Sequence, residues 1–333
     1  MANKVPTIYD VARLSGVSSA TVSRVLNDPS LVAEDKRQKV LDAIKVLNFV
    51  PKADAVITAR KLYKKICVIA PFFTQPVFMQ RLRGVESVLS EEHFELVIYS
   101  IESSEDLRDY ISTITTTNRC DGLIIFSLHL EEESLNQLKN ASFPVCFVES
   151  TLDGFDSVII QNVDGGKKAA EFFLKKGCKR PGFIGEKSTQ KYNVPATEER
   201  LLGYREYFFS ENIEIKKEHV WIGEFSKSQL DEGINEFLSQ DELPDCVLCS
   251  SDLIAARFIS ICHERGIEAG KDIKVLGFDN IDISSYIGLS SVSQSLDESG
   301  KMAAHCIINR LQNPDWNNFS MVIPIKIIER ETT

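Results

Sequence analysis

Residues 7–27 read TIYDVARLSGVSSATVSRVLN, and the apolar spacing in this stretch predicts two short helices separated by a glycine. Thr7 and Ser18 are residue types that cap helix N-termini, and Gly16 between them permits a sharp turn. The apolar residues recur at i, i+3 and i+4 on each helix: Ile8, Val11 and Ala12, then Val22, Val25 and Leu26. Two short helices with a tight turn are typical of a helix-turn-helix, in which the second helix enters the major groove of DNA.

The outer face of the second helix carries small and polar side chains. Ser19 and Ala20 permit close approach to DNA, and Ala20 can contact a thymine methyl group. Thr21, Ser23 and Arg24 can bond phosphates or base edges, with the arginine the strongest candidate for guanine. The full set of residues that we expect to contact DNA is Thr7, Tyr9, Ser18, Ser19, Ala20, Thr21, Ser23, Arg24 and Asn27, together with Leu62.

A third helix is expected over residues 34–47, because Asn48 tolerates a left-handed backbone and Pro51 cannot continue a helix. The apolar residues that would pack over the first two helices are Val40, Leu41, Ile44 and Leu47. We therefore predict a small all-α DNA-binding domain over residues 1–50 and a hinge or linker over residues 51–65.

The charge of the chain is divided unevenly. Residues 1–65 hold twelve Lys and Arg against six Asp and Glu, a net charge of +6, so the remainder of the −10 chain carries −16. A small basic head on a large acidic body indicates a nucleic-acid reader attached to a second function. An ordinary solvated surface on the head is the alternative that charge alone leaves open.

Length and composition bound the class of protein. The 333 residues allow two or three domains, and 43% hydrophobic with 26% charged residues are average values for a globular chain. This composition excludes extensive disorder, collagen-like repeats and disulfide-dense scaffolds. The sequence holds no apolar run near the roughly 18 residues of a membrane span, and its start lacks the apolar core of a signal peptide, so we expect a cytoplasmic protein.

The eight cysteines are scattered, and several lie in apolar runs. In a reducing compartment such residues behave as small buried hydrophobes. Cys246 and Cys249 form a CxxC that could serve redox chemistry or half of a zinc site, but the run CVLC is strand-like and has no second CxxC or paired His nearby. We therefore expect these thiols in the core, and neither a metal nor a cofactor.

From residue 66 onward, apolar runs rich in Val, Ile and Leu alternate with helical segments. The predicted strands are Ile66–Pro71, Phe94–Ser100, Gly122–Phe126, Val145–Glu149, Val158–Gln161, Gly182–Gly185, His219–Phe225, Cys246–Cys249, Ile273–Phe278 and Met321–Ile328. Continuous apolar strands spaced by helices indicate parallel sheets covered on both faces. Because ten strands would make an unusually wide sheet, we expect an α/β body of two doubly wound lobes with a ligand cleft at the carboxyl ends of the strands.

The head and the body together resemble the LacI/GalR family of bacterial transcription regulators. The resemblance rests on TIYDVA, GVS and ATVSRVLN within residues 7–27, and it continues along the whole chain. The matching body segments are Asp121–Ile125, Asn162–Gly166 with Ala169 and Ala170, Gly177, Arg200–Tyr204, Pro244–Asp252 and Gly277–Asn280.

The resemblance implies a periplasmic-binding-protein-like body of type I. It assigns effector binding and dimerisation to residues 66–333, with crossovers between the lobes near residues 161, 294 and 322. The first lobe would hold about residues 66–161 and 295–321, and the second about residues 162–293 and 322–330.

In the family, an arginine before a Gly-aromatic pair and an aspartate in a GFD segment reach into the cleft and hold the effector. These positions match Arg200 and Asp279, and Asp252 is a further polar candidate. A guanidinium and a carboxylate on opposite walls can chelate adjacent hydroxyl groups, while apolar ring faces suit aromatic side chains. The aromatic candidates at strand ends are Phe72, Phe73, Phe126 and Phe225, for each of which a place in the core is an equal alternative.

Four positions of the body depart from the usual family pattern. Val194 and Ala196 lie six and four residues before the effector arginine, which makes this wall poorer in hydrogen bonds than in purine- or lactose-responsive members. Ser251 stands in place of the usual Asn, and Gln161 in place of the usual Asp. These changes indicate an altered effector, for which a sugar or sugar derivative is the first expectation.

The hinge departs more sharply. Family members carry Ala-Arg-x-Leu soon after the proline, and the leucine wedges into the minor groove of the operator. Here Thr58 occupies the leucine position, and a similar ARKL that ends at Leu62 appears one helical turn later. Either Leu62 has become the wedge, or Val56 and Ile57 have, or the protein bends its operator less. We favour Leu62.

An enzyme is the rival class for a two-lobed α/β chain. The sequence has no GxGxxG after a strand, no GxSxG and no HExxH, and GFIGEKS over residues 182–188 lacks the phosphate-loop spacing. We therefore predict a transcription regulator without enzyme activity, a repressor that binds a near-palindromic DNA operator as a homodimer and responds to a small molecule. The alternative is a body that responds to a protein corepressor, as in catabolite-control members.

Overall fold

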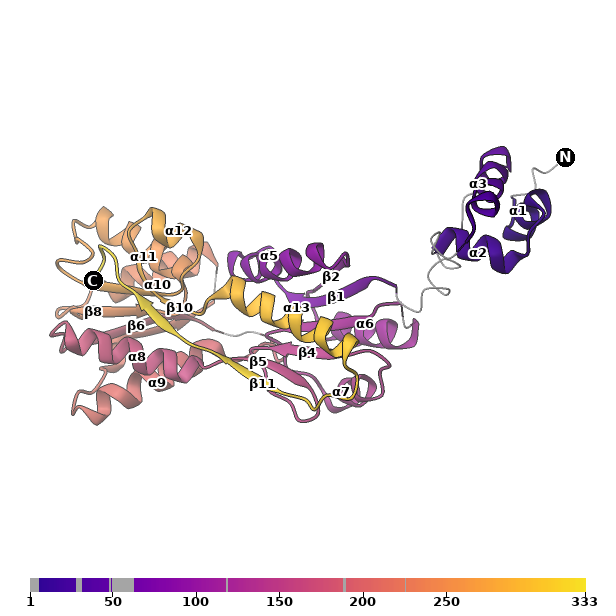
Figure 1. Cartoon of the computed structure of the whole chain (residues 1–333). Coiled ribbons are helices and arrows are strands. Elements are labelled where there is room, and N and C mark those ends of the chain that lie inside the picture. Colours follow the sequence, from indigo (N-terminus) through magenta and orange to yellow (C-terminus); the bar gives the residue numbers. More distant parts are fainter. Residues whose placement is uncertain are drawn as a thin grey trace. The chain divides into compact units, whose positions relative to one another are not determined.

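The computed structural model describes residues 6–27, 32–47, 49, 63–117, 119–187, 190–224 and 226–333 (Figure 1). The chain divides into two compact units, residues 1–65 with 119–121 and residues 66–118 with 122–333. The domain boundaries expected at residues 50 and 65 lie at or near residues outside this description and remain predictions. Among the described residues, no helix is both long enough and apolar enough to cross a membrane.

Three helices form the head: α1 (Ile8–Ser15), α2 (Ser19–Asn27) and α3 (Glu34–Leu47). The backbone N–H of Thr7 donates to the Asp10 carboxylate at the start of α1. Gly16 ends α1 with a φ of 68°, a left-handed conformation that costs glycine little. The three helices enclose a small core of Val11, Ala12, Val22, Val25, Val40 and Ala43. The predicted helix-turn-helix and third helix are confirmed.

The body contains two six-stranded sheets, and we call the halves built on them the N-lobe and the C-lobe. The N-lobe order is β11 (Ser320–Ile323), β5 (Asp156–Ile160), β4 (Val145–Val148), β3 (Gly122–Phe126), β1 (Lys65–Pro71) and β2 (Glu95–Ile101). The C-lobe order is β12 (Lys326–Ile328), β10 (Ser290–Ser293), β9 (Lys274–Asp279), β8 (Cys246–Cys249), β6 (Pro181–Glu186) and β7 (Val220–Gly223). The central strands pair in parallel, whereas β12 is antiparallel to β10. The predicted two-lobed α/β body is confirmed.

Helices pack against both sheets. In the N-lobe they are α5 (Pro76–Glu91), α6 (Ser104–Thr117), α7 (Glu132–Lys139) and α13 (Leu296–Gln312). In the C-lobe they are α8 (Asn162–Lys175), α9 (Ala196–Ser210), α10 (Lys227–Phe237), α11 (Asp252–Glu264) and α12 (Asp282–Tyr286), with a short 3-10 turn at Lys217–His219. Glycines bring helices together: a Cβ at Gly84 of α5 would lie 2.0 Å from the Asp297 carbonyl, and one at Gly203 of α9 would lie 1.9 Å from that of Val163.

In the described part of the chain, the backbone passes between the lobes three times. The crossings join β5 to α8, β10 to α13 and β11 to β12. Figure 1 shows the result for α13, which follows the C-lobe in sequence and yet packs in the N-lobe beside α5. Each lobe is therefore assembled from segments that are distant in sequence.

Two strand predictions are wrong, and both errors have a physical cause. Residues 321–328, expected as one strand, form parts of β11 and β12 in different sheets, because Pro324 between them cannot donate a ladder hydrogen bond. β10 was not expected, because its sequence SSVS lacks an apolar run. Its serines are buried and hydrogen-bonded, as when the Ser291 hydroxyl donates to Asp252 at 2.6 Å. The other predicted strands are present within two residues of their expected ends.

Candidate functional site

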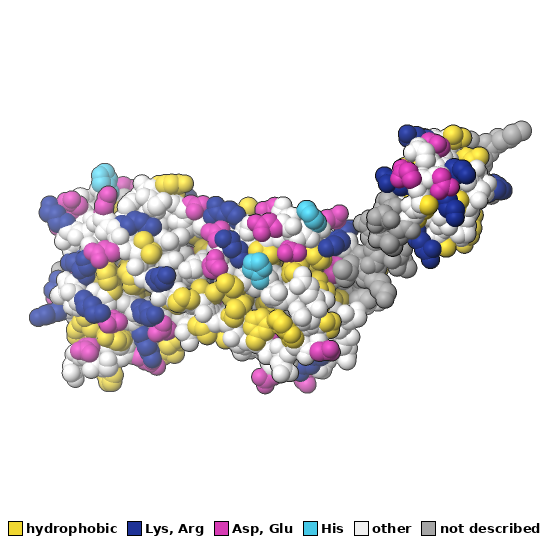
Figure 2. Space-filling model, viewed as in Figure 1, with side chains coloured by type: hydrophobic (Ala, Val, Ile, Leu, Met, Phe, Trp, Pro, Cys, Tyr) yellow, Lys and Arg dark blue, Asp and Glu magenta, His cyan; other side chains and the backbone are white. Residues whose placement is uncertain are grey.

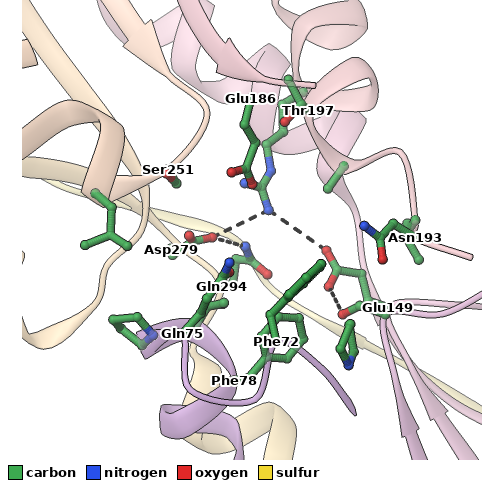
Figure 3. Close-up of a pocket in the computed structure, with 18 of the residues that line it drawn as sticks. Phe72, Gln75, Phe78, Glu149, Glu186, Asn193, Thr197, Ser251, Asp279 and Gln294 are labelled. Carbon is green, nitrogen blue, oxygen red and sulfur yellow. Dashed lines mark hydrogen bonds and ion pairs between the residues drawn. The ribbon is translucent and has the colours of Figure 1, made fainter. Parts of the chain in front are cut away.

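A cleft of about 380 Å³ lies between the two lobes of the body (Figure 3). It opens where strands of both sheets reach their carboxyl ends. Phe72, Ser127 and Glu149 follow β1, β3 and β4 of the N-lobe, and Glu186 and Asp279 end β6 and β9 of the C-lobe. Outside the cleft, acidic and basic side chains are interspersed over the face of the body shown in Figure 2. The cleft is therefore the candidate ligand site of the body.

Arg200 of α9 is held firmly on the C-lobe wall. Its Nε donates to Oδ1 of Asn162 at 2.9 Å, and its Nη1 donates to the carbonyl oxygen of Ser250. Its Nη2 lies 3.5 Å from Oδ1 of Asp279 and 3.9 Å from Oε1 of Glu149. The two short bonds fix the guanidinium, and the two longer ion pairs leave its outer edge directed at carboxylates of both lobes.

Arg81 of α5 is a second buried arginine, and it lies on the N-lobe wall. Its Nη1 donates to Oε2 of Glu149 and to the hydroxyl of Ser127, each at 2.9 Å. The Ser127 hydroxyl in turn donates to the same carboxylate oxygen at 2.6 Å. The side chains of Arg81 and Glu149 are 1% and 6% exposed. Charges buried this deeply persist only when they are paired and hydrogen-bonded.

Gln294 links the two walls from the crossing between β10 and α13. Its Oε1 accepts from Nη2 of Arg81 at 2.9 Å, and its Nε2 donates to Oδ1 of Asp279 at 2.5 Å. These bonds, the Arg81–Glu149 pair and the ion pairs of Arg200 close a ring that spans both lobes. Figure 3 shows the ion pairs to Asp279 and Glu149 as dashed lines. We call its five side chains the cleft ring: Arg81, Glu149, Arg200, Asp279 and Gln294.

The two carboxylates of the cleft ring have opposite pKa shifts. Burial favours the neutral form of Glu149, but the charges of Arg81 and Arg200 and the hydrogen bond from Ser127 outweigh it and lower the pKa to about 2. Burial raises the pKa of Asp279 to about 8, because the attraction of Arg200 offsets it only in part. At neutral pH Glu149 is therefore ionised, whereas Asp279 favours its protonated form.

The backbone is strained at several residues that line the cleft. Phe72, Ser127, Glu149 and Asp279 have φ values of 44°, 51°, 68° and 103°, in the left-handed region that side chains other than glycine avoid. Such conformations cost about 1–3 kcal/mol each and persist where the surrounding structure enforces them. Their concentration at the strand ends is typical of a functional site.

Three of the predicted effector residues line the cleft: Arg200, Asp279 and Phe72. Val194 and Ala196 line it as well, at the two positions where the sequence predicted fewer hydrogen bonds than in purine- or lactose-responsive members. Phe72 is 40% exposed, so its ring is available to a ligand. The cleft therefore contains a guanidinium, a carboxyl group and an aromatic ring, the three kinds of group that the sequence predicted for effector binding.

Other predicted effector residues lie elsewhere. Phe126 is the last residue of β3, is fully buried and belongs to the main hydrophobic cluster, against which Phe73 is also packed. Neither side chain lines the cleft, because each points into the core of the lobe instead of its rim. Their assignment to the effector site is therefore corrected to a core role. Phe225 lies outside the described residues.

Asp252 is also corrected, from effector contact to structural support. Its carboxylate accepts hydrogen bonds from the hydroxyls of Ser284 and Ser291 and from the backbone N–H of Ile281, at 2.6–2.8 Å. The residue is fully buried and does not line the cleft. Burial raises its pKa to about 6, against the lowering effect of these hydrogen bonds. Asp252 thereby holds Ile281 and Ser284, which lie just after Asp279 in the chain.

Sequence reasoning missed most polar residues of the cleft, and four of them matter for its charges and hydrogen bonds: Arg81, Glu149, Glu186 and Gln294. A signal was present for two of them, because Glu149 and Glu186 follow apolar strands directly, as Asp279 does. Arg81 had no such signal, since an arginine in an amphipathic helix normally lies on the surface. Gln294 also had no signal of its own. Its place in the cleft follows only from its position where the chain crosses from β10 to α13.

On the head, the residues expected at DNA lie on the surface of α1 and α2. Tyr9, Ala20 and Arg24 are exposed, while Ser19, Thr21 and Ser23 are half-buried. Ser18 and Thr7 are exposed near the helix starts, and the Ser18 hydroxyl accepts from the backbone N–H of Thr21 at 3.2 Å. The Asn27 side chain and the hinge candidates lie outside the described residues: Val56, Ile57, Thr58 and Leu62.

All eight cysteines are free and buried. Cys246 and Cys249 belong to different hydrophobic clusters, since residues three apart on a strand face opposite sides of the sheet. Among the described residues, one group has the spacing of metal ligands: the donor atoms of Cys178, Asp245 and Cys246 lie within 4.8 Å of one another. The Asp245 oxygens already accept two backbone N–H groups, so this carboxylate serves the local fold.

The fold and the cleft define a helix-turn-helix DNA-binding domain joined to a two-lobed ligand-binding body. Residues 7–52 match the family described as bacterial regulatory proteins, lacI family, and residues 170–333 match the periplasmic binding protein-like domain. The chain is 31% identical over 331 residues to the HTH-type transcriptional regulator RegA of Clostridium saccharobutylicum, covering 98% of this chain and 99% of that protein. It therefore belongs to the lacI family of bacterial regulatory proteins, which are DNA-binding transcriptional regulators.

Solved structures share the fold over the whole chain. The lac repressor dimer bound to operator and the anti-inducer ONPF is 24% identical with a TM-score of 0.82, and 99% of each chain is covered. The complex of the transcriptional regulator CelR with cellobiose is 24% identical with a TM-score of 0.70, covering 98% of this chain and 100% of the other. Both likenesses extend from the head to the end of the body.

Proposed function

We propose that this regulator is a cytoplasmic repressor that binds a near-palindromic operator as a homodimer and is controlled by a sugar or sugar derivative in the cleft. The observation that carries the proposal is the cleft ring beside the exposed ring of Phe72. A guanidinium and carboxyl groups can bind adjacent hydroxyls, and an aromatic face can cover the apolar side of a sugar ring.

The geometry of Arg200 supports hydroxyl binding in the cleft. Its ion pairs with Asp279 and Glu149 are 3.5 and 3.9 Å long, longer than a hydrogen bond between charged groups at about 2.7–2.9 Å. A ligand hydroxyl between these groups would accept from the guanidinium and donate to a carboxylate. The volume of about 380 Å³ falls in the range of small-molecule sites, about 300–1,000 Å³.

Two of the similar structures support the effector class and the assembly proposed for this chain. The regulator CelR forms a complex with cellobiose, which supports a sugar as the effector here. The lac repressor binds its operator as a dimer, which supports a dimer here. In a dimer with twofold symmetry, each head would dock in one half of a near-palindromic site. The residues proposed to contact DNA are Thr7, Tyr9, Ser18, Ser19, Ala20, Thr21, Ser23, Arg24 and Asn27, with Leu62 as the minor-groove wedge.

Control would act through the cleft ring. A ligand that inserts between Arg200 and the carboxylates replaces bonds that now join the lobes, and so favours a different lobe arrangement. Such a ligand changes operator affinity only to the extent that it binds the two arrangements with different affinity. The expected hinge, residues 51–65, leads from the head to β1 of the N-lobe, so it is the route by which the lobe arrangement would reach the heads.

The test combines two measurements on the full chain. A thermal-shift screen against sugars, sugar phosphates, nucleosides and amino acids identifies the ligand, since a ligand at about 100 times its Kd adds about 2.7 kcal/mol of stability. The hit is then added to the complex of the chain with its operator, and release from DNA is followed by fluorescence anisotropy. We expect a sugar to stabilise the chain and release the operator.

A hit among nucleosides or amino acids would contradict the sugar assignment but retain small-molecule control. The absence of any hit, together with operator binding that responds only to a second protein, would contradict small-molecule control. That outcome would favour the protein-corepressor alternative, which predicts that the cleft ring can be substituted without loss of regulation.

A further inference from the structure

The charges that face the cleft are not balanced. Among the described residues that line it are three cations, Arg81, Lys187 and Arg200, and five carboxylates: Glu149, Glu186, Glu198, Glu224 and Asp279. Glu198, Glu224 and Lys187 are exposed to water at the rim, where their charges are screened. The remaining lining charges lie deeper, two cations against three carboxylates. Asp279 favours its protonated form at neutral pH, so the charges of the interior balance, but one of its ionised carboxylates lacks a direct side-chain partner.

Glu186 is that carboxylate. Arg81 is matched by Glu149 at 2.9 Å, and Arg200 lies between Asp279 and Glu149. In the part of the chain that the structure describes, no side chain donates a hydrogen bond to the Glu186 carboxylate or pairs with it within 4.0 Å. Figure 3 shows this side chain extending from the end of β6 into the cleft.

The environment of Glu186 costs free energy in the empty protein. Burial raises the pKa of its carboxyl group, the charge of Arg200 opposes that rise, and Glu198 adds to it. Burial without a partner favours the protonated form of a carboxyl group, and a cation beside it favours the charged form. A neutral ligand hydroxyl would supply a hydrogen bond but no charge, whereas an anionic ligand would add repulsion.

We propose that the effector carries a protonated amine, as an amino sugar does, and that the Glu186 carboxylate is its partner in the cleft. This inference rests on the proposed function, because it names the chemistry of the ligand that the cleft would take. The ring hydroxyls would face Arg200 and Asp279, and the apolar ring face would lie on Phe72. Sugar phosphates and acidic sugars would be rejected, since they would place a second anion beside the Glu186 carboxylate.

The experiment measures the affinity of the full chain by calorimetry for three pairs that differ by one amine: D-glucosamine and D-glucose, D-galactosamine and D-galactose, D-mannosamine and D-mannose. The N-acetyl and 6-phosphate forms of each amino sugar are included. We expect at least one amino sugar to bind about tenfold or more tighter than both its parent and its N-acetyl form, because only the amine pairs with a buried charge.

Two variants assign the effect to Glu186. Glu186→Gln should weaken binding of that amino sugar by about tenfold or more and change the affinity for the parent sugar by less than about twofold. The control Glu232→Gln removes an exposed carboxylate of α10 that does not line the cleft, and it should change neither affinity. Melting of the empty Glu186→Gln protein provides an independent measurement: it should occur at the same temperature as wild type or higher, since an unpaired carboxylate is removed.

The inference is overturned if no amino sugar binds, if a parent sugar or a phosphate binds as tightly as the amine, or if Glu186→Gln binds the amine as wild type does. A neutral sugar that binds the chain and releases the operator would contradict the proposal of an amine-bearing effector but would agree with the proposed function. If none of the compounds binds and none releases the operator, both the amine proposal and the proposed control by a sugar would be contradicted.

Discussion

The guanidinium of Arg81 lies 2.9 Å from the carboxylate of Glu149, and the two side chains are 1% and 6% exposed. Arg83, two residues further along α5, forms ion pairs with Asp282 and Asp297 at 3.3 and 2.9 Å, but its side chain is 53% exposed. The two arginines therefore provide a matched pair for measuring what burial does to an ion pair in one helix.

Replacement of Arg81 by methionine should destabilise the chain by about 3–5 kcal/mol, because it leaves Glu149 charged and without its main partner in the interior. Replacement of Arg83 by methionine should cost no more than about 1 kcal/mol, as expected for exposed pairs. Urea unfolding of both variants measures the difference. Equal losses in the two variants would show that the Arg81 pair is not the deeply buried link described above.

Asp279 should give the stability of the chain a distinctive pH dependence. Its folded pKa of about 8 is above the value of about 3.9 for an unfolded Asp, so between these values the folded state binds more protons than the unfolded state. The contribution of Asp279 to stability is therefore present at low pH and is lost as pH rises through this window. Asp279→Asn should become progressively more stable than wild type from pH 5 to pH 8, by at most about 1.4 kcal/mol per pH unit. A difference that is constant over this range, in urea unfolding at several pH values, would refute the raised pKa.

Gly203 should tolerate no side chain. A Cβ there would lie 1.9 Å from the carbonyl oxygen of Val163, so Gly203→Ala must separate α9 from α8, with a loss of about 1–3 kcal/mol as for other overpacked sites. Arg205→Ala, at an exposed position of the same helix, should change stability by less than about 0.5 kcal/mol. Because α9 carries Arg200, Gly203→Ala should also weaken effector binding. Thermal melting and calorimetry test both parts, and an unchanged melting temperature would contradict the close packing.

Arg24 should contribute to operator binding without affecting the cleft. It is exposed on α2, and the loss of an arginine that contacts a base costs about 1–3 kcal/mol of binding free energy. Arg24→Ala should therefore weaken operator binding by that amount in fluorescence anisotropy and leave effector affinity unchanged. Arg13→Ala is the control, since Arg13 is exposed on α1 and pairs with Asp10 at 2.7 Å. A loss of the same size in both variants would indicate a general charge effect in place of a specific contact.

Arg200 should have the converse effect. Its guanidinium makes two hydrogen bonds and stacks 3.8 Å from the ring centre of Phe278, and a lysine cannot reproduce this planar geometry. Arg200→Lys should weaken effector binding by about 2 kcal/mol or more and abolish effector-dependent release of DNA. Operator affinity without effector should remain at the wild-type value. A variant that loses operator affinity as well, while melting like wild type, would contradict the division of labour between body and head.

The sequence predicted most of the fold because the strands of this body are buried on both faces. Gly122–Phe126 and Cys246–Cys249 have the ends that were expected, since each is a continuous apolar run that a serine follows, Ser127 and Ser250. β10 escaped detection for the converse reason: three of its four residues are buried serines, whose hydrogen bonds to distant residues leave no local pattern.

The cleft was predictable only in part. Arg200 and Asp279 were found through a family motif, and Phe72 through its place after a strand. Arg81 bonds Ser127, 46 residues away, and Gln294 bonds Asp279 and Arg81, 15 and 213 residues away, so nothing in their neighbouring sequence distinguishes them from surface residues. Phe126 illustrates the opposite error, a core residue predicted to bind the effector. In the sequence, an aromatic residue at a fully buried strand end cannot be told apart from one at the rim of the cleft.

The three crossings between the lobes set the order in which a newly made body can fold. Chains emerge from the ribosome from the N-terminus onward, yet α13 and β11 of the N-lobe are made after almost all of the C-lobe. Until residue 323 has been synthesised, β5 is an open sheet edge, and open edges invite pairing with other chains. The head, by contrast, is complete early. A chain truncated before β11 would therefore keep the complete head but leave the edge of β5 open to pairing with other chains.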